Sequence, residues 1–188
     1  MNQTTTAFQK PPHEPSDEAD QNQLDQAKAE GNAYQKSLEY MVNEVADTGG
    51  LKQAGNYRVG FAQERAEGMF MLKAEGQLEW DEVNDENCHL EVAVSDGADG
   101  RFIPYLTVLA TLTPEDGDPV GPIEIPFVWH PGVYHYGKNL KVPGDGRYTL
   151  HIRIEAPTFM RHDDVNGQRY AEGVEVTFED VEIKTGQE

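Results

Sequence analysis

The chain has 188 residues, a length that suits one domain with room for a small appendage. Its 34 acidic residues outnumber 15 basic ones and give a formal net charge of −19 at pH 7. Nucleic-acid binders need a basic surface, and anionic membrane surfaces repel an acidic protein. The composition therefore excludes nucleic acid as a partner, and no stretch approaches the ~20 apolar residues that would insert into a bilayer.

The N-terminal residues are too polar to form part of a core. Residues 1–23 contain no Leu, Ile, Val or Trp, so they bury too little apolar surface to offset the entropy of ordering. We expect a disordered tail over residues 1–15. The start of the chain has neither the basic nor the apolar region of a signal peptide, which predicts a cytoplasmic protein. A trimmed form of a periplasmic or extracellular protein would look the same.

A helical pattern follows within residues 16–50. Ser16 is the expected N-cap, and Gly49-Gly50 is the expected end. Small or apolar residues alternate at spacings of three and four, which predicts one amphipathic helix over residues 17–47. This helix either packs on its own domain or pairs with a partner helix, and the thin seam favours its own domain. The seam consists of Leu24, Ala27, Gly31, Tyr34, Leu38, Met41 and Val45.

The apolar period changes to two in residues 51–188, which indicates strands. Turns rich in Gly, Asp and Pro separate the short alternating runs, and no repeated βαβ pattern is present. The fold class expected is all-β, an antiparallel β-sandwich with an added N-terminal α-helix. The expected strands lie at 57–62, 68–72, 88–94, 105–112, 148–155 and 174–183.

Four of the six histidines are candidate metal ligands. His89 and Glu91 lie two apart on one strand, so either their head groups converge on one point or they form an outward polar pair without a role. His130 and His135 lie in residues 127–139, which we expect to form an aromatic-lined loop. In that loop His135 is either a packed core residue or a ligand. His162 lies in a loop that can offer a further ligand or be incidental.

This residue set favours metal binding over covalent catalysis. Imidazole with an occasional carboxylate suits Cu(II), Fe(II) or Zn(II). Cys88 is the single cysteine, which excludes a multi-cysteine zinc cage. No serine or cysteine stands in the sequence context of an activated nucleophile, so we do not expect an enzyme.

Several short motifs together resemble the Fe2+ transport protein family over about residues 55–183. Each is weak alone, but their order and spacing agree with the family. They are Cys88-His89-Leu90-Glu91, Phe102-Ile103-Pro104-Tyr105-Leu106, His135-Tyr136-Gly137-Lys138-Asn139, Gly146-Arg147-Tyr148 and Arg161-His162-Asp163.

The resemblance implies a small dimeric immunoglobulin-like sandwich that binds copper and iron, usually in the bacterial periplasm. It implies His89, His135 and His162 as metal ligands, with Glu91 as a further or alternative ligand. The family usually has a methionine shortly before the His-Tyr-Gly motif, and this chain has none there. Either His130 takes that role, or the site is smaller, or a thioether reaches in from Met69 or Met71.

The function expected is therefore binding of iron or copper, with zinc possible in their place, in iron uptake or delivery. The resemblance implies a homodimer, with a membrane permease as a further partner. One alternative is a non-catalytic interaction module that uses the N-terminal helix to bind a partner. A second is a metalloenzyme with an open coordination position, for which Glu91 is the visible general base.

Overall fold

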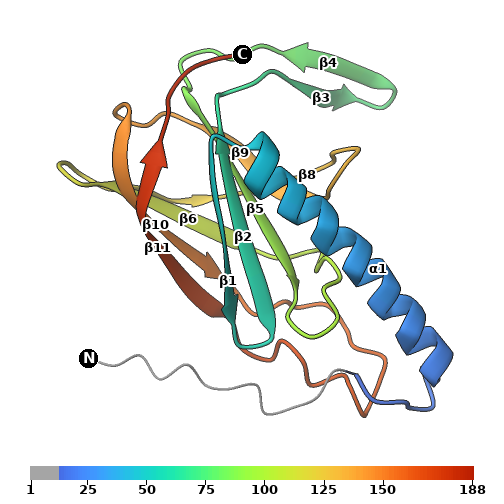
Figure 1. Cartoon of the computed structure of the whole chain (residues 1–188). Coiled ribbons are helices and arrows are strands. Elements are labelled where there is room, and N and C mark those ends of the chain that lie inside the picture. The colour runs from blue at the N-terminus through green and yellow to red at the C-terminus, as the bar shows by residue number, and fades with distance from the viewer. Residues whose placement is uncertain (1–12) are drawn as a thin grey trace.

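Two antiparallel sheets face each other in the computed structural model, which describes residues 13–188 (Figure 1). The five-stranded sheet has the order β1-β2-β5-β9-β8, and the four-stranded sheet has the order β11-β10-β6-β7. The first sheet comprises β1 (Thr48–Ala54), β2 (Tyr57–Glu64), β5 (Cys88–Asp96), β9 (His135–Leu140) and β8 (Phe127–Val128). The second comprises β6 (Val108–Pro114), β7 (Val120–Glu124), β10 (Gly146–Ile154) and β11 (Val174–Ile183). The expected all-β sandwich is confirmed.

The main core lies between the sheets and follows the alternation seen in the sequence. Leu90 and Val92 of β5 pack in one cluster with Leu150 and Ile152 of β10. A separate hairpin, β3 (Met69–Ala74) and β4 (Gln77–Asp81), projects from the sandwich (Figure 1). Most of its large apolar side chains are exposed.

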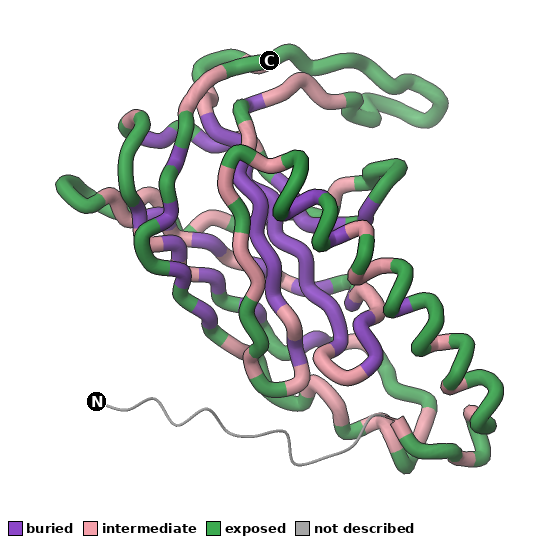
Figure 2. Tube along the Cα trace, in the orientation of Figure 1, coloured by how far each residue is buried: buried purple, intermediate pink, exposed green. Residues whose placement is uncertain are grey.

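The helix covers the outer face of the five-stranded sheet. Helix α1 (Gln21–Tyr40) continues into a π-helical turn, η1 (Met41–Val45). Leu38, Met41 and Val42 pack against Ala62 of β2 and Ala93 of β5 in a second core cluster. Both faces of β5 are therefore covered, and every residue of this strand is buried (Figure 2). The helix packs on its own domain, which is the alternative that the sequence analysis favoured because the apolar seam is thin.

The helix begins later than expected because Asp20, and not Ser16, is its N-cap. The Asp20 side chain accepts a hydrogen bond from the Gln23 backbone N–H, and the Gln23 side chain accepts one from the Asp20 N–H. Ser16 instead donates to Asp163 in a distant loop. Residues 1–12 of the expected tail lie outside the described residues. His13 belongs to that expected tail, yet it contacts Asp99.

Five strands lie where the sequence analysis predicted none, namely β1, β4, β7, β8 and β9. Residues around Gly49-Gly50 form β1, which pairs along its whole length with β2. Residues 135–140, expected as loop, form β9, which pairs with β5. One predicted strand is shorter than expected, because Tyr105 has a positive φ of 61° and β6 starts only at Val108. Among residues 13–188, no helix combines the length and apolar character that a bilayer crossing requires.

Gly31 marks a close approach between α1 and the turn after β5. A Cβ at Gly31 would lie 1.9 Å from the carbonyl oxygen of Asp99. We expect Gly31→Ala to lower the free energy of unfolding by about 1–3 kcal/mol, as overpacking does. Helix propensity alone would raise it by about 1 kcal/mol. Urea denaturation measures the sign of the change in the free energy of unfolding, and Asn32→Ala at an exposed position of the same helix is the control. A Gly31→Ala variant more stable than the unaltered chain would contradict the close approach.

Candidate metal centre

The pairing of β5 with β9 brings the Cys88–Glu91 motif and the His135–Asn139 motif together. His89 lies opposite Asn139, and Glu91 lies opposite Gly137. Side chains two apart on a strand share a face, so His135 lies on the same face as His89 and Glu91. That face is the one that α1 and η1 cover. Three candidate ligands from two strands thus converge under the helix.

The ligand atoms of His89, Glu91 and His135 all lie within 4.8 Å of one another. Glu91 Oε1 is 3.0 Å from His135 Nε2 and 3.7 Å from His89 Nε2. An ion with bonds of about 2.0–2.2 Å holds its ligand atoms roughly 3–3.5 Å apart, so these separations fit a single ion after small shifts. All three residues are buried. The geometry therefore suits a two-histidine, one-carboxylate centre.

Asn139 orients the His89 ring. Its Nδ2 donates to the Glu67 carbonyl at 2.7 Å, which turns its Oδ1 toward His89 Nδ1 at 2.9 Å. The amide oxygen only accepts, so Nδ1 carries the proton in this assignment. The lone pair of Nε2 then faces the centre. An outer hydrogen bond of this kind is how metal-binding histidines are usually held.

His135 is held in the same way by a backbone group. Its Nδ1 donates to the Val133 carbonyl at 3.1 Å, so Nε2 faces Glu91. Burial opposes a charge on His135, but the hydrogen bond and charge of Glu91 outweigh burial and raise the pKa of the imidazole. Burial likewise opposes ionised Glu91, yet the hydrogen bond and charge of His135 hold its carboxyl pKa below the ordinary value. The contact between the two groups therefore favours the charged form of each, and an incoming metal ion would displace the proton from His135 Nε2.

Two buried ligand atoms have no hydrogen-bond partner among the described residues, His89 Nε2 and Glu91 Oε2. Buried polar atoms are nearly always paired, so each such atom needs an explanation. Gly137 lies beneath them and leaves a space. A Cβ there would be 3.2 Å from His89 Nε2 and 3.2 Å from His135 Cδ2. A metal ion in this space would satisfy the unpartnered atoms.

We expect Gly137→Ala to weaken metal binding by about tenfold or more. A loss of this size is typical when residues that hydrogen-bond to metal ligands are mutated. The added methyl group would cover the lone pair of His89 Nε2 from 3.2 Å. Isothermal titration with Co(II) measures the affinity, and the melting temperature without metal shows whether the fold is kept. A variant that keeps full affinity would show that the ion does not occupy this space.

His130 lies beside the centre but not as a ligand in this conformation. Its ring centroid is 5.7 Å from that of His135. Its Nδ1 accepts hydrogen bonds from the backbone N–H groups of Gly132 and Val133, at 3.0 and 3.2 Å. A neutral imidazole that accepts at Nδ1 carries its proton on Nε2, which leaves no lone pair for a metal ion. The expected role of His130 as a replacement ligand therefore has no geometric support.

His162 is far from the other two histidines within one chain. Its side chain is 92% exposed, and its Nδ1 donates to Glu18 at 3.0 Å, just before α1 begins. The metal centre lies at the opposite end of α1, where Met41 lines the adjoining pocket. A helix of 20 residues separates the two ends by about 30 Å. Within one chain, His162 therefore does not meet His89 and His135.

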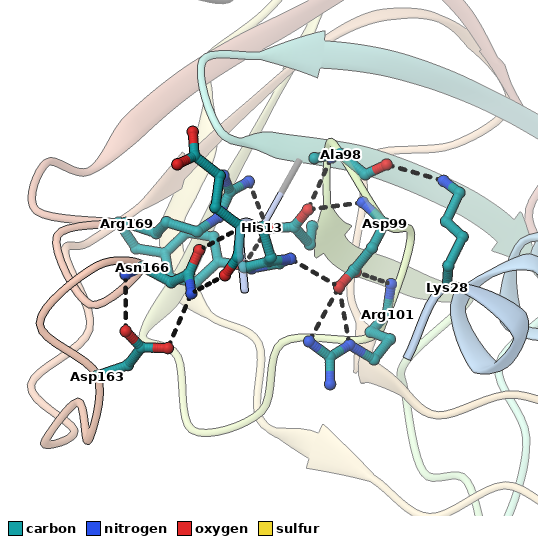
Figure 3. Close-up of polar contacts among 11 residues, drawn as sticks. His13, Lys28, Ala98, Asp99, Arg101, Asp163, Asn166 and Arg169 are labelled. Carbon is teal, nitrogen blue, oxygen red and sulfur yellow. Dashed lines mark hydrogen bonds and ion pairs between the residues drawn. The ribbon is translucent and has the colours of Figure 1, made fainter. Parts of the chain in front are cut away.

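A polar network fixes the loop that carries His162. Asn166 bonds to the backbone of Glu14, and Arg169 bonds to Asp96 at the end of β5. His13 pairs with Asp99 beside them (Figure 3). The N-terminal segment and the turn after β5 thus hold this loop at the N-terminal end of α1.

A pocket of about 450 Å³ opens next to the centre and contains two carboxylates that the sequence did not single out. Glu64, Glu67, Glu91 and His130 line it together with Tyr40 and other residues of α1 and η1. Burial and the neighbouring carboxylates Glu91 and Glu67 raise the pKa of Glu64 to about 7. Glu64 is opposite His89 in the β2–β5 register, a pairing that sequence periodicity cannot reveal. Met69 and Met71 are not among the described lining residues.

The fold and the cluster define an antiparallel β-sandwich protein with a buried histidine–carboxylate centre. The model of the Fe2+ transport protein family matches residues 37–184, and the chain belongs to this family. The resemblance drawn from the sequence motifs is thereby confirmed. Most of α1 and the segment before it lie outside the matched residues.

Individual relatives are more distant. UPF0423 proteins of Brucella abortus and Brucella suis are each 34% identical over 88 residues, 43% of this chain and 48% of the relative. The match thus spans about half the length of these relatives. FetP of uropathogenic Escherichia coli F11, recombinantly expressed in the periplasm, has a TM-score of 0.58 at 22% identity, covering 73% of this chain and 94% of FetP. Copper-reconstituted P19 of Campylobacter jejuni has a TM-score of 0.57 at 18% identity, covering 71% and 94%. Both support the fold.

Proposed function

We propose that the protein binds a divalent transition-metal ion at His89, Glu91 and His135 and takes part in iron uptake or delivery. Iron and copper are the leading candidates, and zinc suits the same ligands. One observation carries the proposal: two buried ligand atoms of the cluster lack hydrogen-bond partners among the described residues, and Gly137 leaves a small space beside one of them, His89 Nε2. Family membership supports iron as cargo, and the copper in P19 supports copper as a second ion.

The pocket beside the centre supports delivery rather than permanent storage. Structural metal sites are usually closed to solvent, whereas His89, Glu91 and His135 adjoin an opening of about 450 Å³. The carboxylates at this opening attract cations, and the surplus of negative charge on the chain strengthens the attraction. An ion can therefore enter, and a receptor such as a membrane permease can receive it through the same opening.

Metal retention after chelation and reloading tests the proposal. We expect the chelated protein to take up one Fe(II) or Co(II) ion per chain and to retain it through desalting. An interaction module without a metal function would retain none above the background of an acidic control protein. Turnover by the loaded protein would favour the metalloenzyme alternative, in which Glu91 is both ligand and base.

His162 fits a role only between two copies of the chain. Its ring is 92% exposed, and the bond from Nδ1 to Glu18 leaves Nε2 directed away from its own carboxylate partner. We propose a homodimer in which this ring approaches the centre of the second copy. Sedimentation equilibrium and Co(II) titration of His162→Ala test this arrangement. A monomeric chain with unchanged affinity on His162→Ala would remove both the dimer and the ligand role.

For the cellular compartment, the proposal relies on family membership and not on the residues at the start of the chain. The comparisons do not support the cytoplasmic expectation, and the resemblance to a family that is usually periplasmic supports the periplasmic alternative. We propose that the protein works outside the cytoplasm, where it would deliver metal to a permease. Fractionation of the source cells tests this, and recovery with cytoplasmic markers would contradict it.

A further inference from the structure

Glu67 lies at the rim of the centre and belongs to none of the motifs read from the sequence. Its Oε1 is 3.9 Å from His89 Nε2, the buried nitrogen that lacks a partner. Its side chain is 45% exposed, so the carboxylate lies where the pocket meets solvent. Among the described residues, no hydrogen bond holds this carboxylate. It can therefore move toward an ion at low cost.

The backbone of Glu67 is fixed although its carboxylate is not. The carbonyl accepts from Asn139 Nδ2 at 2.7 Å, and the N–H donates to Asn139 Oδ1 at 3.4 Å. The same Oδ1 accepts from His89 Nδ1. One asparagine thus holds the His89 ring and the main chain of Glu67 together. Rotation of the Glu67 side chain alone could close the remaining gap to an ion bound at His89.

Val128 lies on the neighbouring wall of the same space and offers no donor. It pairs directly with His135 in the β8–β9 register, so the two side chains share a face. Its Cγ2 would be 3.2 Å from a Cβ at Gly137, as near as His89 Nε2. On the open side, an oxygen of Glu67 lies 3.9 Å from His89 Nε2 and can supply the added donor.

We propose that Glu67 is a fourth protein ligand, which closes on the ion after entry and makes the centre selective for ferrous-type divalent ions over cuprous ions. This inference rests on the proposed metal function. Two carboxylates balance a divalent charge, whereas a cuprous ion would leave one negative charge uncompensated in a largely buried site. Oxygen ligands also favour harder ions, and cuprous ions prefer thioether and thiolate sulfur. The side chain of Val128 offers no sulfur atom to the ion.

Three variants of the full chain test the role of Glu67 and Val128. Glu67→Gln keeps the shape of the side chain and removes its charge, and Glu79→Gln removes a charge from an exposed position on β4. We expect Glu67→Gln to weaken Co(II) binding about tenfold or more, a change of ~1.4 kcal/mol, with Cu(I) affinity within about twofold of the unaltered chain. Val128→Met should strengthen Cu(I) binding about tenfold. Chelator competition measures both ions, and Co(II) visible absorption reports a change in ligand set.

The outcomes separate this inference from the function on which it rests. Glu67→Gln that binds Co(II) like Glu79→Gln, with the same absorption spectrum, overturns the role of Glu67 and leaves the histidine centre intact. An equal loss of Co(II) and Cu(I) overturns the selectivity. An unaltered chain that binds neither ion above background overturns the proposed function and this inference together.

Discussion

Replacing His89 or His135 with alanine should abolish tight metal binding. Each ring supplies one of the two nitrogens in the cluster, and each is held by its own outer hydrogen bond, from Nδ1 to Asn139 or to the Val133 carbonyl. Loss of an outer bond alone typically costs about 10–100-fold in affinity, so loss of the ligand itself should cost at least ~100-fold. Isothermal titration with Co(II) measures the loss.

The matched control for these variants is His151→Ala. His151 is a strand histidine on β10 whose side chain is 40% exposed and lies 3.4 Å from Glu175. The His151→Ala variant should bind Co(II) like the unaltered chain, because His151 lies on the other sheet. Equal affinities for all three variants would mean that bound metal resides elsewhere on the acidic surface.

Metal affinity should fall steeply on acidification. Burial of His135 opposes its charge, but Glu91 outweighs burial and raises the imidazole pKa above its ordinary 6.5. A proton on Nε2 competes with the ion, so affinity should rise with pH up to this raised pKa and level off above it. Below it, affinity should drop about tenfold per pH unit, with roughly one proton released per ion. Titrations in buffers of different ionisation enthalpy, between about pH 5.5 and 8.5, measure both quantities.

Glu91→Gln provides the control for this pH profile. The amide removes the charge that favours imidazolium, so the rise in affinity should move to lower pH even though the maximum affinity is reduced. Affinity that stays flat across the same range in the unaltered chain would show that His135 Nε2 is not a ligand.

The sandwich could be predicted from the sequence because its core strands alternate cleanly. Leu90 and Val92 face one way and His89 and Glu91 face the other, and this period fixes the faces without any knowledge of pairing. The strand β9 was missed because His135, Tyr136 and Gly137 show no alternation of polar and apolar residues. All three are buried, so their composition resembles an aromatic loop.

The centre could be predicted only in part for a similar reason. The motifs around His89 and His135 identified these residues as candidate ligands. The sequence alone does not show whether His89 and Glu91 are exposed or buried, because that depends on how α1 covers the sheet. Glu64 and Glu67 stand in no motif, and only the β2–β5 register and the bonds to Asn139 bring them near His89. His162 lies far from the other two histidines within one chain, because local periodicity does not determine where a loop points.

The helix changes what the polar face of β5 can do. Leu38 and Met41 exclude water from the sheet beside His89 and Glu91, and electrostatic interactions strengthen where water is excluded. The family match begins at residue 37, so Leu38 and Met41 lie inside it, although most of α1 does not. The N-terminal helix therefore acts here as part of the wall of the centre.

Anomalous diffraction from crystals loaded with Fe(II) or Co(II) tests the central claim most directly. We expect one strong peak at about 2.0–2.2 Å from His89 Nε2, His135 Nε2 and a Glu91 oxygen, above Gly137. A peak bound only to surface carboxylates, with these two rings left without metal, would contradict the account.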